Sequence, residues 1–113
     1  MKNIRSIVPL LPAQQWMLTA TLKSTPDTYV QQLPFEVNEH TLSEIRQAID
    51  KLVQSYECFR SLILFEGLKQ PVWVCGEDTK PALLSHQVKE SSIYRLIGEI
   101  RAQGFDFQKQ PCL

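Results

Sequence analysis

The feature that most constrains this chain is an amphipathic helix pattern near its middle. Thr41 and Glu44 form the capping box T-x-x-E, in which each side chain bonds an otherwise unpaired backbone N–H of the other residue. An apolar helical stripe follows and the opposite face is polar, so we expect a helix of about five turns that anchors the fold. Burying each larger side chain of the stripe would contribute roughly 1.5–3 kcal/mol. The stripe consists of Leu42, Ile45, Ala48, Ile49, Leu52, Val53, Tyr56 and Phe59.

Two shorter helices are expected, one on each side of it in the sequence. Pro12 suits a first helical turn, because its missing N–H would be unpaired there anyway, and the pattern continues to about Lys23. The other helix should begin after Ser91 or Ser92 as the N-cap and end at Gly104. Their apolar positions are Ala13, Trp16, Met17 and Ala20 in the first helix, and Ile93, Leu96, Ile97 and Ile100 in the second.

Four segments have the character of strands. In the first of them Pro34 lacks a backbone donor, so that strand should lie at a sheet edge or carry a bulge. The second and third are rich in β-branched and aromatic residues and are separated by a loop around Gly67, which predicts a hairpin. The order of elements indicates an α/β (α+β) fold with helices packed on a mixed sheet, and the absence of a linker indicates one structural unit over residues 1–113. The segments are Tyr29–Val37, Ser61–Phe65, Val72–Cys75 and Leu83–Val88.

Charge and hydropathy exclude two classes of partner. Twelve basic residues balance twelve acidic ones, and no basic stripe is present, so we expect no binding to nucleic acid. No apolar run approaches the ~20 residues that span a bilayer, so we expect no membrane contact. The apolar stretch Ile7–Leu11 follows Lys2 and Arg5 as in a secretion signal, but Pro9 interrupts it and no small-residue cleavage site follows. We expect a cytoplasmic protein.

The residues by themselves show no catalytic or metal-binding constellation. The glycines are scattered, which excludes a phosphate loop, and Cys58, Cys75 and Cys112 lack the pairing and close spacing of a disulfide framework or zinc site. We therefore expect reduced, mostly buried thiols, and predict no metal site, bound cofactor or catalytic residue. We interpret the remaining candidates as structural or solvated side chains: His40, His86, Glu36 with Glu39, and Glu77 with Asp78.

Four stretches, taken in order and spacing, resemble the opening part of the condensation domains of non-ribosomal peptide synthetases. Residues 9–18, PLLPAQQWML, are similar to the family motif P-L-[ST]-x-A-Q, and residues 52–63, LVQSYECFRSLI, to L-V-x-R-H-E-x-L-R-T-x-F. Residues 70–74, QPVWV, are similar to the following hairpin strand. Residues 105–107, FDF, with Pro111 and Leu113, resemble P-F-D-L-x-x-x-P-L.

The resemblance implies a partial chloramphenicol acetyltransferase-like lobe without the second lobe. Complete domains of this family join carrier-bound aminoacyl and peptidyl thioesters by amide formation, on phosphopantetheine arms that enter a tunnel between two lobes. The family's H-H-x-x-x-D-G motif does not occur in these residues, so we expect the chain alone to be inactive. Carried over onto this sequence, Arg60 would pair with the aspartate of that motif and support its histidine loop. Gln14 would bond nearby backbone, and Trp16 and Met17 are expected to pack in the core rather than line the tunnel.

Two other accounts of the function remain open. The chain could be a standalone module that docks a carrier domain or a synthetase without catalysis, or part of another acyltransferase that uses coenzyme A thioesters. In the leading account the partners are the remainder of a synthetase and its carrier domains. An unpaired sheet edge would also favour self-association with a second copy.

Overall fold

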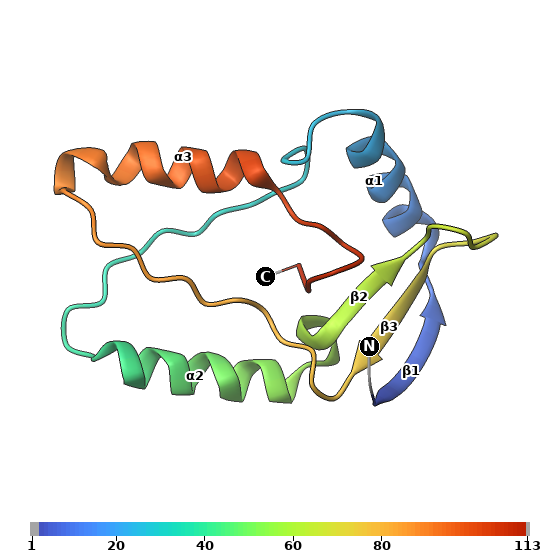
Figure 1. The fold of residues 1–113 in the computed structure, drawn as a ribbon, viewed down its shortest axis with the longest axis horizontal. Helices are drawn as coiled ribbons and strands as arrows, with labels where there is room; N and C mark the ends of the chain where they lie inside the picture. Colours follow the sequence, from blue (N-terminus) through green and yellow to red (C-terminus); the bar gives the residue numbers. More distant parts are fainter. Residues whose placement is uncertain (1–2, 113) are drawn as a thin grey trace. The chain divides into compact units, whose positions relative to one another are not determined.

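The computed structural model describes residues 3–112, so Lys2 and Leu113, which entered two of the patterns above, lie outside the described part. Its contacts group the residues into two compact units, where the sequence led us to expect one. Of the described residues, the first unit comprises 3–10, 34–83 and 106–112, and the second comprises 11–33 and 84–105. Helices and strands together confirm the mixed α/β class (Figure 1).

A three-stranded sheet forms the centre of the first unit. Its order is β1-β3-β2, with β1 at Ile4–Pro9, β2 at Ser61–Leu64 and β3 at Val72–Gly76. Both pairings are antiparallel, so the expectation of a mixed sheet is wrong for the strands described. The hairpin of β2 and β3 is confirmed, with Leu62 opposite Val74 and both side chains buried.

Strand β1 was not anticipated from the sequence. Its side chains are exposed or half-buried, so β1 lacks the alternation of buried and solvated positions that marks a strand covered on one face. The strand exists because β3 offers a free edge: Val8 lies opposite Trp73 and Ile7 opposite Val74. A register shift between Ile4 and Ser6 marks a bulge at its beginning.

Helix α2, Leu42–Ser55, begins with the predicted capping box. The Thr41 hydroxyl accepts a hydrogen bond from the Glu44 N–H at 3.2 Å, and Glu44 Oε1 accepts one from the Thr41 N–H at 3.2 Å. His40 Nδ1 lies 3.1 Å from the same carboxylate. The contact with His40 contributes most to lowering the pKa of Glu44, and the hydrogen bonds from Thr41 contribute next. The carboxylate therefore stabilises the folded state above the ordinary glutamate pKa of 4.5, and this contribution is lost as the pH falls below it.

The far end of α2 differs from the prediction. The helix has 14 residues, about four turns, because Tyr56 adopts an extended backbone with φ −131° and ψ 120°. A 3-10 turn, η1 at Glu57–Arg60, then leads directly into β2. Within the apolar stripe of the helix only Val53 is buried, while Leu42 and Leu52 are exposed. The stripe is real but largely uncovered in the described chain.

Replacing Thr41 with alanine is expected to lower the free energy of unfolding by about 1 kcal/mol, because the Glu44 N–H loses its acceptor. Urea unfolding followed by circular dichroism measures the change. Ser43→Ala, two positions into the same helix, is the matched control and should change stability by no more than a few tenths of a kcal/mol. Equal losses in the two variants would contradict a capping role for Thr41.

The second unit contains helices α1, Pro12–Lys23, and α3, Ile93–Gln103. Both predicted ranges are confirmed, but the apolar face predicted for α1 is wrong. Its buried side chains are Leu18 and Thr21 rather than the predicted positions, because the hydrophobic pattern of this helix is weak. A 3-10 turn, η2 at Glu90–Ser92, precedes α3, and Ser92 takes the N-cap position without a side-chain bond, so the predicted serine cap is wrong in mechanism.

Three residues before position 33 contact α3 or its C-cap: Pro26, Asp27 and Gln32. Asp27 Oδ2 lies 3.8 Å from Arg101 Nε, and Gln32 Nε2 donates to the Ile97 carbonyl at 3.0 Å. Gly104 ends the helix as predicted, with φ 61° and ψ −151°, and its N–H donates to Arg101 O. A Cβ added at Gly104 would lie 2.6 Å from Pro26 Cβ and against the carbonyl of Pro26. The backbone at Gly104 therefore lies closer to Pro26 than a residue with a Cβ could come.

Two predicted strands do not form. Tyr29–Val37 and Leu83–Val88 carry no strand in the structure. Val30 N–H instead donates to Asp27 O at 3.1 Å in a turn. An alternating pattern specifies which side chains would share a face, but a strand also needs a neighbouring edge to pair with. Neither segment finds one among the described residues.

Candidate functional site

Arg60 ends η1, immediately before β2, and is 8% exposed. Its Nε donates a hydrogen bond to the Val53 carbonyl at 3.1 Å. This carbonyl lies in the last turn of α2, where backbone acceptors lack helical partners and a positive charge is favoured. The last turn of α2 contains no basic residue of its own. Arg60 therefore folds back and caps the helix, a structural role that the sequence pattern did not indicate.

The charge of Arg60 has no counterion among residues 3–112. None of the carboxylates in this part of the chain lies within 4.0 Å of its guanidinium. No fully buried side-chain nitrogen or oxygen lacks a hydrogen bond in the described residues, so the two η nitrogens, which make none, must touch solvent. Because Arg60 as a whole is only 8% exposed, its stem is buried and the η nitrogens reach solvent only in part. Such a fork can bind a carboxylate through two parallel hydrogen bonds.

Neighbouring contacts fix the backbone on which Arg60 sits. Ser61 Oγ donates to the Glu57 carbonyl at 2.8 Å, and Ser61 itself is buried at the start of β2. The thiol of Cys75, opposite Ser61 in the sheet, approaches the same carbonyl at 3.9 Å. The turn η1 is thereby tied to two strands, which holds the arginine in place.

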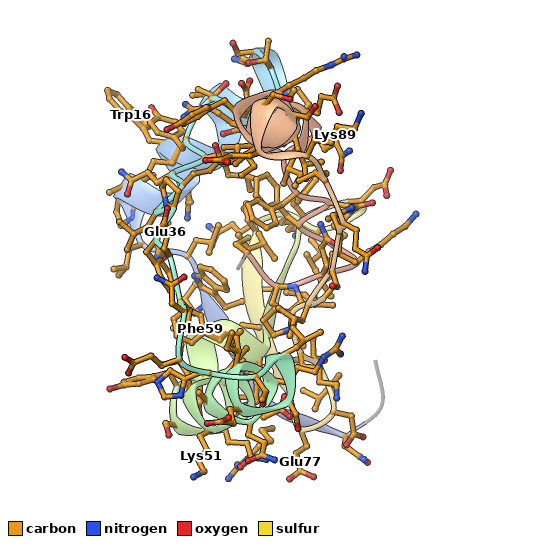
Figure 2. The ribbon with its side chains drawn as sticks, turned by 90° about the vertical axis from the view of Figure 1, so that its left-hand side faces the viewer. Trp16, Glu36, Lys51, Phe59, Glu77 and Lys89 are labelled. Carbon is orange, nitrogen blue, oxygen red and sulfur yellow. The ribbon has the colours of Figure 1, made fainter. Side chains whose placement is uncertain are left out.

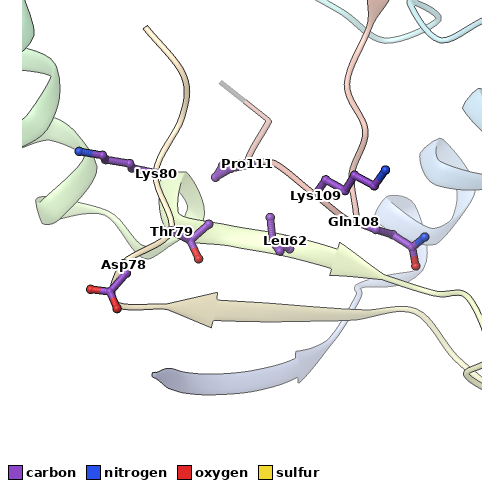
Figure 3. A pocket seen from close by; sticks show the side chains of 7 residues that line it. All are labelled: Leu62, Asp78, Thr79, Lys80, Gln108, Lys109 and Pro111. Carbon is purple, nitrogen blue, oxygen red and sulfur yellow. The ribbon is translucent and has the colours of Figure 1, made fainter. Parts of the chain in front are cut away.

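A pocket of about 580 Å³ opens beside β2 (Figure 3). Arg60 is not among its lining residues. Leu62 forms its floor, and Figure 3 shows the Lys80 and Lys109 side chains leaving it in opposite directions. The lining residues are Leu62, Asp78, Thr79, Lys80, Gln108, Lys109 and Pro111.

Most polar groups of this pocket are already engaged. Asp78 Oδ2 accepts from Asn3 at 2.9 Å, and Lys109 Nζ lies 3.7 Å from Asp106 Oδ2. Gln108 bonds the backbone after β2 through its side chain. The groups do not converge on one point, so the pocket does not specify a ligand. A smaller hollow of about 300 Å³ lies between α2 and residues 80–83.

The histidines and paired carboxylates predicted to be non-catalytic lie at the surface. His40 is exposed beside Glu44, and His86 is exposed in an irregular segment rather than in a strand. The acidic pairs of residues 36 and 39, and 77 and 78, are exposed as well. Among residues 3–112, no three His, Cys, Asp or Glu side chains come together in a way that could hold a metal ion.

The opening motif has one confirmed and one incorrect prediction. Gln14 Oε1 accepts a hydrogen bond from the Leu11 N–H at 2.8 Å, which is the backbone role expected of it. Trp16, expected in the core, is 84% exposed and projects from α1 (Figure 2). Met17 is also exposed. Helical spacing alone could not identify which face of a weakly amphipathic helix is covered.

The cysteines are free thiols in the described residues, but the prediction that most are buried is wrong. Only Cys75 is buried, while Cys58 and Cys112 are exposed. Although much of Cys112 reaches solvent, its sulfur is shielded enough that burial raises the pKa of the thiol to about 11. At neutral pH this thiol is therefore almost entirely protonated, and the thiolate is the reactive form.

Alkylation at pH 8 is expected to modify Cys58 at least about tenfold faster than Cys112, because the thiolate of Cys112 is scarce at a pKa of about 11. Cys75 should react only on unfolding. Peptide mass spectrometry after brief iodoacetamide treatment gives the three rates, and treatment in denaturant provides the reference in which all three converge. Faster labelling of Cys112 than of Cys58 would contradict the shielding of its sulfur.

None of the helices within residues 3–112 is long and apolar enough to cross a bilayer. The chain matches no protein-family model and no curated protein.

Proposed function

We propose that this chain is the first part of a condensation-type acyltransferase domain that forms amide bonds between carrier-bound thioesters in non-ribosomal peptide synthesis. Support comes from the four motif matches in family order and from the elements that carry them. The first motif runs from the end of β1 into α1, the second from the end of α2 through η1 into β2, and the third into the first half of β3. The fourth begins at Phe105, after α3, and ends beyond the last described residue.

The observation that carries the proposal is the open charge of Arg60. A guanidinium on a buried stem, without a carboxylate within 4.0 Å among residues 3–112, keeps its two η nitrogens available for a carboxylate partner. In the family, the residue at this position pairs with the aspartate of H-H-x-x-x-D-G. The arrangement of Arg60 suits that partner, because its backbone is held by η1 and its fork is free.

In such a domain the acceptor amine attacks the thioester carbonyl, the tetrahedral oxyanion collapses, and the phosphopantetheine thiol leaves as the amine loses its proton. The rate arises from positioning the two thioesters and from stabilising the developing charge. The second histidine of the motif stands at this centre. Arg60 would be a positioning residue, which holds the histidine loop through its aspartate and does not touch the substrates.

The coding sequence beyond Leu113 provides the first test. H-H-x-x-x-D-G shortly downstream would support condensation, whereas D-x-x-x-x-D at that place would indicate heterocyclisation. The matching assay compares the 113-residue chain with a product extended through both lobes, each supplied with carrier-bound donor and acceptor thioesters. Mass spectrometry of the carriers should show an amide product only with the extended protein. Amide formation by the 113-residue chain alone would refute the proposal.

A docking module without catalysis is the second candidate, and exposed apolar side chains on α1 favour it. Trp16, Met17 and Leu22 are all exposed on this helix. Pull-down with carrier proteins, bare and acyl-loaded, tests it, with Trp16→Ala as the discriminating variant and Lys23→Ala as the control on the same helix. Retention that Trp16→Ala abolishes would favour docking, and no retention of either carrier would exclude it. Retention of free coenzyme A thioesters would instead indicate a coenzyme A-dependent acyltransferase.

A further inference from the structure

The two outer edges of the sheet are protected by different means. On β1, the Leu10 N–H donates to the Pro71 carbonyl, so by alternation Pro9 faces the outer edge, where it has no donor to offer. The bulge between Ile4 and Ser6 disturbs the other end of this strand. Proline and bulges are the usual obstacles to edge pairing. The edge of β1 is therefore a poor template for another strand.

The edge of β2 has no such obstacle in its own sequence. Residues 61–65 read SLILF, a segment without charge, proline or glycine and with high strand propensity. Alternation places the N–H groups of Ile63 and Phe65 on the side away from β3. Without cover, these residues form the segment of the described sheet best suited to pair with another chain.

Residues 106–110, here called the strap, occupy this edge. The Phe107 carbonyl accepts from the Ile63 N–H at 2.9 Å. The side chain of Gln108 replaces the next peptide group: its Oε1 accepts from the Phe65 N–H at 3.2 Å and from the Glu66 N–H at 3.1 Å, and its Nε2 donates to Glu66 Oε2 at 3.3 Å. Figure 3 shows Gln108 and Pro111 on either side of Leu62 along β2.

A tight turn at Asp106 fixes the strap. Its carbonyl accepts from the N–H groups of Lys109 and Gln110, both at 3.0 Å, and its Oδ1 accepts from the Gln108 N–H at 3.3 Å. The strap is thus a short turn rather than a strand. The strap bonds the β2 edge through one backbone carbonyl and one side-chain amide. A full strand would form a continuous ladder of backbone hydrogen bonds there, so it can displace the strap.

We propose that the strap guards the β2 edge against pairing with the same edge of a second copy of this chain. The edge is self-complementary about a two-fold axis: with Ile63 opposite its counterpart, Ser61 of each copy lies opposite Phe65 of the other. All of these positions can donate and accept, and no charge is brought together. Displacing Gln108 frees the Phe65 N–H group for that partner.

Gln108→Ala is the decisive variant, and Gln110→Ala is the matched control from the same turn, since the Gln110 side chain makes no hydrogen bond within residues 3–112. Light scattering over a concentration series should show Gln108→Ala associating at about tenfold lower concentration than wild type, because the three side-chain hydrogen bonds from Gln108 to Phe65 and Glu66 are lost. Gln110→Ala should match wild type. Equal association of the two variants would overturn the proposal.

Amide hydrogen exchange separates edge pairing from general unfolding. In the associated Gln108→Ala species, Ile63 and Phe65 should be protected and the central strand β3 should keep its wild-type protection. Loss of protection in β3 would mean that the variant aggregates through unfolding, and would also overturn the proposal. Asp106→Ala, which loosens the strap without touching β2, should show the same association in weaker form.

Discussion

Gly104→Ala is expected to lower the free energy of unfolding by at least about 2 kcal/mol. The backbone at Gly104, with φ 61° and ψ −151°, lies in a region that is essentially restricted to glycine and costs about 1–3 kcal/mol for other residues. The new Cβ would also lie 2.6 Å from Pro26 Cβ and against the Pro26 carbonyl. The backbone at Pro26 would therefore have to move. Urea unfolding followed by circular dichroism measures the loss.

Gly98→Ala is the matched control for this variant. Gly98 lies inside α3 with nothing within 4 Å of an added Cβ, so alanine should raise stability by about 0.5–1 kcal/mol through helix propensity. The two substitutions add the same methyl group, one inside α3 and one at its C-cap, and should act in opposite directions. If Gly104→Ala lowers the free energy of unfolding by less than about 0.5 kcal/mol, the backbone around Pro26 and Gly104 can relax to admit the new Cβ, contrary to the geometry described above.

On the proposed function, Arg60→Met is expected to lower the rate of amide formation by an extended domain about 100-fold, because without the proposed pairing to the aspartate of the motif the histidine loop would shift by about 1 Å. The same substitution should change the stability of the 113-residue chain by less than about 1 kcal/mol. It removes the bond to Val53, but also removes a charge that has no counterion among residues 3–112. Steady-state kinetics and urea unfolding give the two quantities.

The kinetic signature distinguishes positioning from a purely structural role. The catalytic rate should fall while the half-saturating carrier concentration stays near its wild-type value, and Arg60→Lys should recover only part of the rate, because an ammonium cannot form the two parallel bonds. Arg46→Met, an exposed arginine on α2, is the control and should leave both quantities unchanged. Activity that declines only in proportion to stability would identify Arg60 as a helix cap and nothing more.

The candidate site was only partly accessible from sequence. Arg60 was selected by its place in a motif at the end of the expected long helix, but α2 ends at Ser55 and Arg60 ends the 3-10 turn η1 before β2. Its bond to Val53 could not be foreseen, because it depends on the helix ending at Ser55 and the chain reversing through η1. The strap was missed for a related reason. Gln108 acts through backbone groups about forty residues away, and no spacing rule connects them.

The sequence by itself determined the features that are decided within a few residues: the capping box of α2, the start of α1 at Pro12, the end of α3 at Gly104 and the hairpin of β2 and β3. Only the tertiary structure decided that Ile4–Pro9 is a strand, that Tyr29–Val37 is not, and that Trp16 faces outward. The physical reason is that helix hydrogen bonds and caps join residues three or four apart. A strand or a buried face exists only when a distant part of the chain supplies its partner.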